Sequence, residues 1–115
     1  MKRAFAILLR QSRKAAGVSM GFLADWLGVS VPYVSDVELG NRAPFTYPRI
    51  LDTARLFNIS PLPLIAAASQ ERAVFELSAN VGSEQIKLGA QLVKAWPHLT
   101  SAQVEAITRI LEATT

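Results

Sequence analysis

The segment over residues 17–44 constrains the fold more than any other part of the chain, because it specifies two short helices joined by a tight turn. Ser19 and Ser30 each carry a side-chain oxygen suited to a helix N-cap, and each precedes a run with helical apolar spacing. Gly28 supplies the permissive backbone that a turn between two helices needs. Gly40 stands where the second helix should end. We therefore expect a helix after Ser19, a turn at Gly28 and a second helix from Ser30 to about Gly40.

Apolar spacing gives each of these two helices an inner face. Leu23, Ala24 and Leu27 recur at helical intervals in the first helix, as Val34 and Val37 do in the second. The outer face of the second helix then carries Val31, Pro32, Tyr33, Ser35 and Asp36. A helix presented in this way has the geometry that enters a DNA groove.

The whole chain is predicted to be all-α, because no strand-like alternation occurs in it. Outside the central pair, we expect helices over residues 4–16, 48–57, about 61–77, 83–96 and from 101 onward. We expect residues 1–80 to form one domain. Residues 81–115 are expected to form a C-terminal helical hairpin that docks on this domain or pairs between chains.

Composition argues against several other classes of protein. The 115 residues include no cysteine, so neither a disulfide framework nor a cysteine metal site is expected. His98 is the only histidine and follows Pro97, without an acidic cluster at ligand spacing. No stretch approaches the length of a membrane span. We expect a cytoplasmic protein that is not an enzyme and binds no metal, cofactor or membrane.

Charge is distributed unevenly along the chain, whose formal net charge is +3. Residues 1–60 hold eight basic and four acidic residues, and residues 61–115 hold four basic and five acidic residues. Arg3, Arg10 and Lys14 share one face of the first predicted helix. This stripe is either a solvated face or a surface for DNA phosphates. The basic half of the chain is thus also the half with the paired helices.

Residues 9–61 resemble the lambda-repressor-like (Cro/Xre type) helix-turn-helix family. The residues that carry the resemblance are Arg13, Gly17, Val18, Ser19, Leu23, Ala24, Leu27, Gly28, Val29, Ser30, Tyr33, Val34, Ser35, Asp36, Val37, Glu38, Gly40, Arg42, Pro44, Ile50, Ala54, Phe57, Asn58, Ile59 and Ser60. The resemblance implies a five-helix domain that binds double-stranded DNA, usually as a dimer on a two-fold operator.

The resemblance also implies roles for individual residues. Arg13 and Glu38 match a structural ion pair of the family. The base-reading positions hold Val31, Pro32, Tyr33 and Asp36, none of them a residue that makes strong bidentate contacts with bases. The DNA-backbone candidates, from the resemblance and the basic stripe together, are Arg3, Arg10, Lys14, Ser19, Met20, Ser30, Ser35, Asn41 and Arg42.

Two groups of apolar residues are interface candidates. Phe22 and Trp26 lie one helical turn apart at positions that are normally polar in the family. Either the C-terminal helices of the same chain cover them or a second molecule does, and Phe45 presents the same choice. The C-terminal candidates are Leu92, Trp96, Leu99, Val104, Ile107 and Leu111. Two short helices cannot bury that surface alone, so homodimerisation through them is our hypothesis.

Two functions follow from these features. The first is a sequence-specific, double-stranded-DNA-binding transcriptional regulator, acting as a homodimeric repressor. The alternative is an antitoxin-like or adaptor protein that uses the same scaffold to bind a protein partner.

Overall fold

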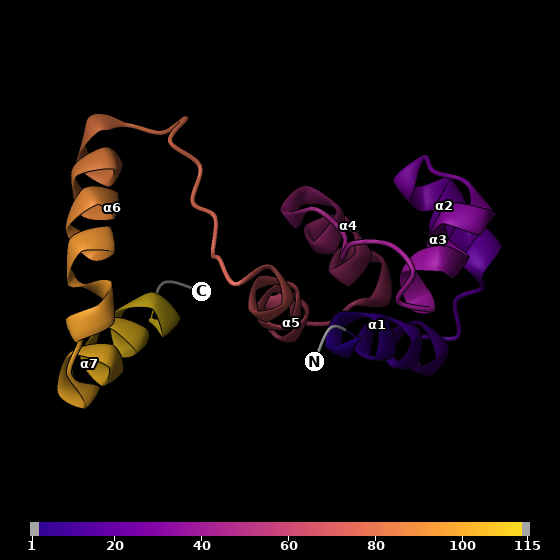
Figure 1. Cartoon of the computed structure of the whole chain (residues 1–115), viewed down its shortest axis with the longest axis horizontal. Helices are drawn as coiled ribbons and strands as arrows, with labels where there is room; N and C mark the ends of the chain where they lie inside the picture. The colour runs from indigo at the N-terminus through magenta and orange to yellow at the C-terminus, as the bar shows by residue number, and fades with distance from the viewer. Residues whose placement is uncertain (1–2, 114–115) are drawn as a thin grey trace. The chain divides into compact units, whose positions relative to one another are not determined.

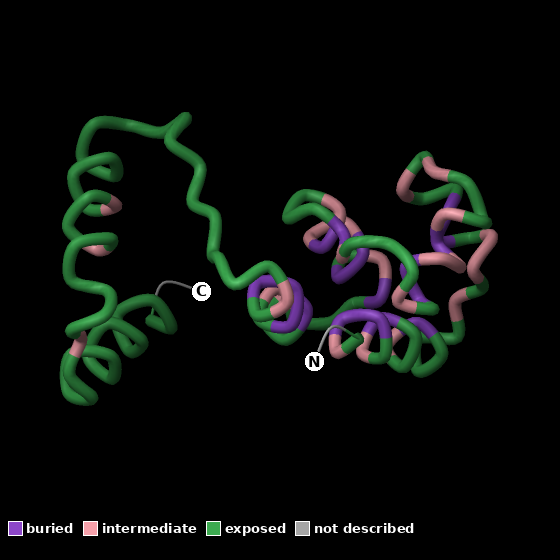
Figure 2. Tube along the Cα trace, in the orientation of Figure 1, coloured by how far each residue is buried: buried purple, intermediate pink, exposed green. Residues whose placement is uncertain are grey.

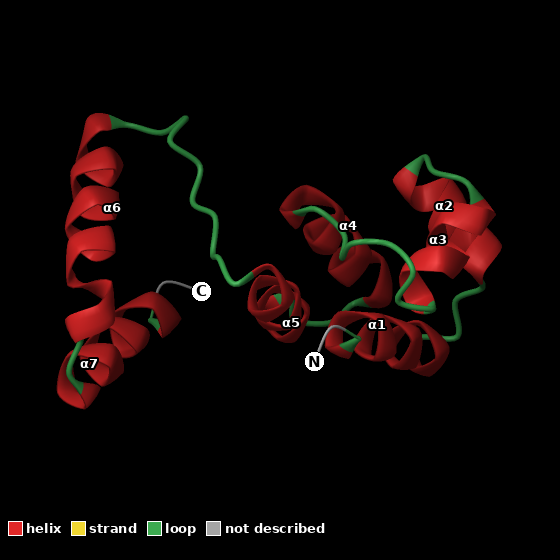
Figure 3. Ribbon diagram, in the orientation of Figure 1, coloured by secondary structure: helices red, strands yellow, loops and turns green. Residues whose placement is uncertain are grey.

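The computed structural model describes residues 3–113, which form seven α-helices and one 3₁₀ turn and contain no strand (Figures 1 and 3). The prediction of an all-α chain is therefore confirmed. The chain divides into two compact units, Met1–Phe75 and Glu76–Thr115. No helix in the described part of the chain is long and apolar enough to cross a membrane.

The first unit contains five helices in chain order: α1 (Ala4–Ala15), α2 (Met20–Leu27), α3 (Val31–Glu38), α4 (Tyr47–Phe57) and α5 (Leu62–Arg72). Local capping explains the α2–α3 pair as predicted. The Ser19 hydroxyl accepts from the Phe22 amide at 3.0 Å, and the Ser30 hydroxyl accepts from the Tyr33 amide at 3.2 Å. Gly28 ends α2 with φ +70°, a left-handed conformation that favours glycine.

All five helices contribute to the core of the first unit, which is the region that Figure 2 colours as buried. The predicted inner faces are confirmed at Leu23, Ala24, Val34 and Val37, all of which are buried, whereas Leu27 is half-buried. Further buried core residues are Phe5, Leu9, Phe45, Ile50, Phe57, Leu64, Ala67 and Ala68.

The end of α5 holds together segments that are far apart in the sequence. The carboxylate of Glu71 accepts from the Phe5 amide at 3.3 Å, which satisfies a free donor at the start of α1. The guanidinium of Arg72 donates to the carbonyl of Phe45 at 2.8 Å and also to that of Pro44. The start of α1 and the loop between α3 and α4 are therefore both held by α5.

Helix α5 is shorter than predicted, since it ends at Arg72 and not near residue 77. Ala73 adopts a left-handed conformation with φ +57°, and the Val74 amide donates back to the Ser69 carbonyl at 3.1 Å, as in a Schellman cap. The buried face of the helix ends at Ser69, whereas Val74 and Leu77 are exposed. A longer helix would therefore bury no additional core surface.

The second unit contains α6 (Ser83–Ala95), the 3₁₀ turn η1 (Trp96–His98) and α7 (Ser101–Glu112). A capping box starts α7: the Gln103 amide donates to the Thr100 hydroxyl at 3.1 Å, and the Thr100 amide donates to the Gln103 side chain at 2.9 Å. No described residue of this unit is buried, as Figure 2 shows. Residues 76–113 thus form helices without a buried core among themselves.

Candidate nucleic-acid interface

The first turn of α3 forms the most accessible part of the predicted reading surface. Val31 and Pro32 are exposed there, whereas Ser35 and Asp36, one turn further on, are half-buried. A groove of DNA would therefore meet two apolar side chains first. Their role in base contact stays a prediction.

A buried ion pair fixes the other end of α3 to α1. Arg13 Nε donates to Glu38 Oε2 at 2.6 Å and Arg13 Nη2 donates to Glu38 Oε1 at 3.0 Å, so both carboxylate oxygens are used. The side chains are 9 % and 1 % exposed, respectively. Arg13 Nη1 also donates to the Val18 carbonyl at 2.9 Å. The expected ion pair is confirmed, and its placement gives it a structural role.

The charge state of Arg13 follows from the same contact. Its hydrogen bonds to Glu38 raise the pKa of Arg13 above the ordinary value, with a further contribution from the negative charge of Glu38 and an opposing one from burial. An arginine is already protonated throughout the physiological range. A change of pH within that range therefore does not break the contact between α1 and α3 by removing the charge of Arg13.

Tyr33 lies inside a cluster of aromatic and basic side chains. Its ring stacks on Phe45 with centroids 6.0 Å apart and planes inclined by 23°. The guanidinium carbons of Arg42 and Arg49 lie 5.1 and 5.2 Å from its ring centroid. Its hydroxyl oxygen accepts from Arg49 Nη1 at 2.9 Å. Tyr33 is thus half-buried and held by protein groups on its ring and at its hydroxyl.

The placement of Phe45 at an interface is wrong. The side chain is fully buried, and its ring meets that of Phe5 edge-on with centroids 5.7 Å apart. The segment between α3 and α4 turns this side chain into the core, where Arg72 holds the backbone carbonyl. Phe45 is therefore covered by α1 and α3 of its own unit and forms part of the scaffold under Tyr33.

The aromatic pair on α2 remains at the surface of the first unit. Phe22 is 58 % exposed and Trp26 is 47 % exposed. The indole N–H of Trp26 donates to the Asp52 carbonyl at 2.9 Å, so Trp26 ties α2 to α4 within the chain. Phe22 has the larger exposed fraction of the two and stays an interface candidate.

Five DNA-backbone candidates lie at the N-caps of α2 and α3, at the start of α2 or directly after α3. The hydroxyls of Ser19 and Ser30 accept from backbone amides, and each still has an O–H to donate. Met20 is half-buried and packs against the core. Asn41 and Arg42 are exposed directly after α3. Contact of any of these residues with phosphate stays a prediction.

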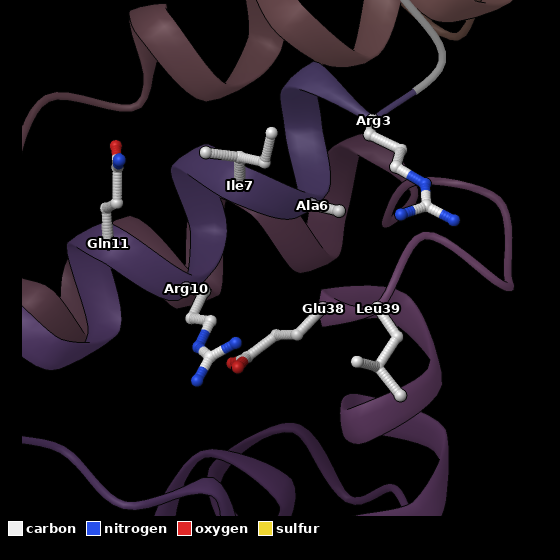
Figure 4. A pocket seen from close by; sticks show the side chains of 7 residues that line it. All are labelled: Arg3, Ala6, Ile7, Arg10, Gln11, Glu38 and Leu39. Carbon is white, nitrogen blue, oxygen red and sulfur yellow. The ribbon is translucent and has the colours of Figure 1, made fainter.

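The basic stripe of α1 lies beside the carboxyl end of α3. Arg3 and Arg10 are exposed and line a shallow pocket, drawn in Figure 4, together with Ala6, Ile7, Gln11, Glu38 and Leu39. Lys14 is exposed but does not line this pocket. The eight residues of α3 separate Leu39 from Val31 by about 12 Å. Arg3 and Arg10 are thus remote from the exposed first turn of α3.

The C-terminal interface candidates show two degrees of exposure. Leu92 and Leu99 are half-buried, whereas Trp96, Val104, Ile107 and Leu111 are exposed.

Among residues 3–113, no group of three histidine or acidic residues is placed to hold a metal ion.

Sequence reasoning missed Arg49, which lies in the first turn of α4. A cation at a helix N-terminus opposes the helix dipole, and such a placement signals that another interaction holds the residue. The first turn of α4 contains no acidic residue, and the Thr46 side chain does not cap the helix. The signal was present in the sequence, but the contact with Tyr33 spans sixteen positions and is not visible there.

Comparison with known proteins identifies the family to which this arrangement of helices belongs. A family model described as a helix-turn-helix domain matches residues 4–67. Among solved structures, the chain is similar to the restriction-modification controller protein C.AhdI from Aeromonas hydrophila, at 35 % identity and a TM-score of 0.49. That match covers 55 % of this chain and 94 % of the other. None of the curated proteins compared with the chain matches it.

Proposed function

This chain belongs to the helix-turn-helix family, whose model covers more than half of it, and from that premise we propose that it is a sequence-specific regulator of transcription that binds double-stranded DNA. The observation that carries the proposal is the arrangement of α3. Its carboxyl end is fixed by the Arg13–Glu38 pair, while Val31 and Pro32 at its other end are exposed. The recognition helix of a helix-turn-helix protein contacts base edges with its N-terminal residues, and these are the exposed residues of α3.

Base recognition in this proposal depends on few polar contacts. Val31 and Pro32 contact thymine methyl groups, and Asp36 accepts from a cytosine amine. Asn41 and Arg42, directly after α3, bind phosphates and set the position of the helix in the groove. With so few polar groups at the bases, sequence-dependent DNA shape supplies a large share of the specificity.

The protein acts as a homodimeric repressor in this proposal. The first unit is a five-helix, lambda-repressor-like domain, and α6 and α7 form a helical hairpin that pairs with its copy. Support comes from the second unit, in which Val93, Val104 and Ile110 are exposed and no described residue is buried. So small a unit has no sufficient core alone. Two copies on one DNA site then give the two-fold symmetry of an operator.

The dimer is tested by sedimentation of the intact chain and of a chain that ends at Asn80. We expect a dimer from the first and a monomer from the second. In the intact chain, Ile110→Glu should also shift the protein towards monomer, because it places a charge in the paired surface. Thr108→Glu, an equal charge change at an exposed polar position of α7, is the matched control. Monomeric behaviour of the unmodified chain would exclude the paired hairpin.

DNA binding is tested by the salt dependence of affinity for duplex DNA. Each phosphate contact contributes about 0.9 to the slope of log affinity against log salt concentration, so a regulator should lose affinity steeply as salt rises. We expect Arg42→Ala to weaken binding to every duplex tested. Selection of bound duplexes from a random pool would then identify the operator and its half-site spacing.

A protein partner is the second candidate function, and the exposure of Phe22 favours it. An antitoxin-like or adaptor protein would present Phe22 and Trp26 of α2 to another protein. Binding that ignores both salt and Arg42→Ala, yet fails with Phe22→Ala, would support this candidate over the regulator.

A further inference from the structure

The Arg42 and Arg49 side chains form an arrangement that the helix-turn-helix motif does not account for. Both guanidinium carbons lie within 5.2 Å of the centroid of the same Tyr33 ring. Their separation therefore cannot exceed the sum of those two distances. Within residues 3–113 neither side chain is paired with a carboxylate, because the ion pairs there join Arg13 to Glu38 and two exposed pairs elsewhere.

Two like charges at one ring repel each other, and a specific set of contacts holds them there. The Tyr33 hydroxyl accepts a hydrogen bond from Arg49 at 2.9 Å, and the ring face attracts both cations. Phe45 stacks on the same ring and is fully buried, so it fixes the position of the Tyr33 ring that both arginines contact. The arginines are thus held before any ligand arrives.

The first turn of α4 adds a second, independent attraction for an anion. Tyr47, Pro48 and Arg49 occupy this turn with no acidic residue among them, and the Thr46 side chain caps no amide there. Because proline has no N–H, the donors of this turn are the amides of Tyr47 and Arg49. The partial positive charge of the helix N-terminus therefore lies at Arg49. Two guanidinium groups that contact one ring, one of them in the first turn of a helix, are a phosphate-binding combination.

We infer that Arg42, Arg49 and the first turn of α4 form one binding site for the phosphate backbone of a DNA strand, and that Tyr33 is the positioning residue of this site. The inference rests on the proposed function and changes the role expected for Tyr33. Its hydroxyl orients Arg49 and does not select a base. The site recognises phosphate in any sequence, so it sets affinity and register while α3 sets specificity.

The test measures salt dependence with four full-length variants on two duplexes of unrelated sequence. Arg49→Gln should lower the salt slope by about 1 on both duplexes, which is one lost phosphate contact. Arg55→Gln is the matched control, because Arg55 lies on the same helix and pairs with Asp52 at 3.2 Å, away from the site. It should leave the slope unchanged.

Tyr33→Phe retains the ring and removes the hydroxyl that holds Arg49. A positioning residue acts through its partner, so the double variant Tyr33→Phe with Arg49→Gln should bind no more weakly than Arg49→Gln alone. Thermal unfolding of each variant shows whether a loss of binding reflects a loss of fold.

Each remaining outcome overturns a particular claim. If the two substitutions weaken binding additively, Tyr33 acts independently of Arg49 and the positioning role is excluded. If Tyr33→Phe changes the preference between the duplexes, Tyr33 contacts a base and the positioning role is likewise excluded. An unchanged slope in Arg49→Gln would exclude the phosphate site while leaving DNA binding intact. Salt-independent or absent duplex binding by the unmodified protein would overturn the proposed function together with the site.

Discussion

Substitution of Glu38 by alanine should cost about 3–5 kcal/mol of folding free energy, because it leaves a buried cation without its partner. The Arg13 and Glu38 side chains are 9 % and 1 % exposed, so water cannot replace the lost carboxylate. An exposed ion pair, by contrast, contributes at most about 1 kcal/mol.

The structure indicates where this energy comes from. Glu38 accepts two of the three hydrogen bonds that Arg13 makes, at 2.6 and 3.0 Å, and the third, to Val18, remains after the substitution. A hydrogen bond to a charged group contributes about 1.5–3 kcal/mol, so the loss of two costs about 3–6 kcal/mol, which includes the range given above. For a domain of this size the melting temperature should fall by at least about 12 °C.

Urea unfolding monitored by Trp26 fluorescence in a Trp96→Phe background reports on the first unit alone. Asp52→Ala is the control, because it removes an exposed ion pair from the same unit and should change stability by less than about 1 kcal/mol. Replacement of both partners, Arg13→Met with Glu38→Leu, should cost less than Glu38→Ala alone, since no uncompensated charge remains.

Two results would refute this reasoning about Glu38. A cost below about 1 kcal/mol for Glu38→Ala would mean that Arg13 is solvated or finds another partner. A double substitution that costs as much as the two single substitutions together would mean that packing, and not charge pairing, dominates.

Three further local features of the first unit can be tested by substitution and thermal unfolding. Trp26→Phe should cost about 1 kcal/mol, because it removes the indole hydrogen bond to the Asp52 carbonyl, and no change would argue against that contact. Gly28→Ala should cost about 1–2 kcal/mol since φ is +70° there, whereas Gly21→Ala within α2 should be neutral or stabilising; equal effects would exclude the backbone explanation. Phe45→Ala should cost about 3–5 kcal/mol, and a cost typical of a surface residue would contradict its burial.

The features that could be predicted from the sequence are those set by neighbouring residues. Ser19, Ser30 and Thr100 cap helices by contacts three positions away, so their roles are visible in a short window. Gly28 is equally local, because a left-handed turn needs no distant partner. The Arg13–Glu38 pair spans 25 positions and was accessible only through resemblance to a family.

The features that were missed depend on contacts between distant segments. Phe45 stands in a loop, and only the packing of α1 and α3 against that loop shows that the ring is core. Arg49 looks like a solvated cation until Tyr33 is placed beside it. The end of α5 was missed because Ala73 adopts a left-handed conformation that alanine rarely takes.

The contacts made by the last turn of α5 have a consequence for folding during synthesis on the ribosome. Glu71 bonds to a residue 66 positions earlier, and Arg72 bonds to the loop that carries Phe45. While the ribosome is still synthesising α4, neither residue has been added to the chain. The Phe5 amide at the start of α1 then lacks its acceptor, and the carbonyl of Phe45 lacks its donor. Contacts of such long sequence separation also form late in folding. A nascent chain stalled at Ser60 should therefore be cleaved readily by protease, and one stalled well beyond Arg72 should resist it.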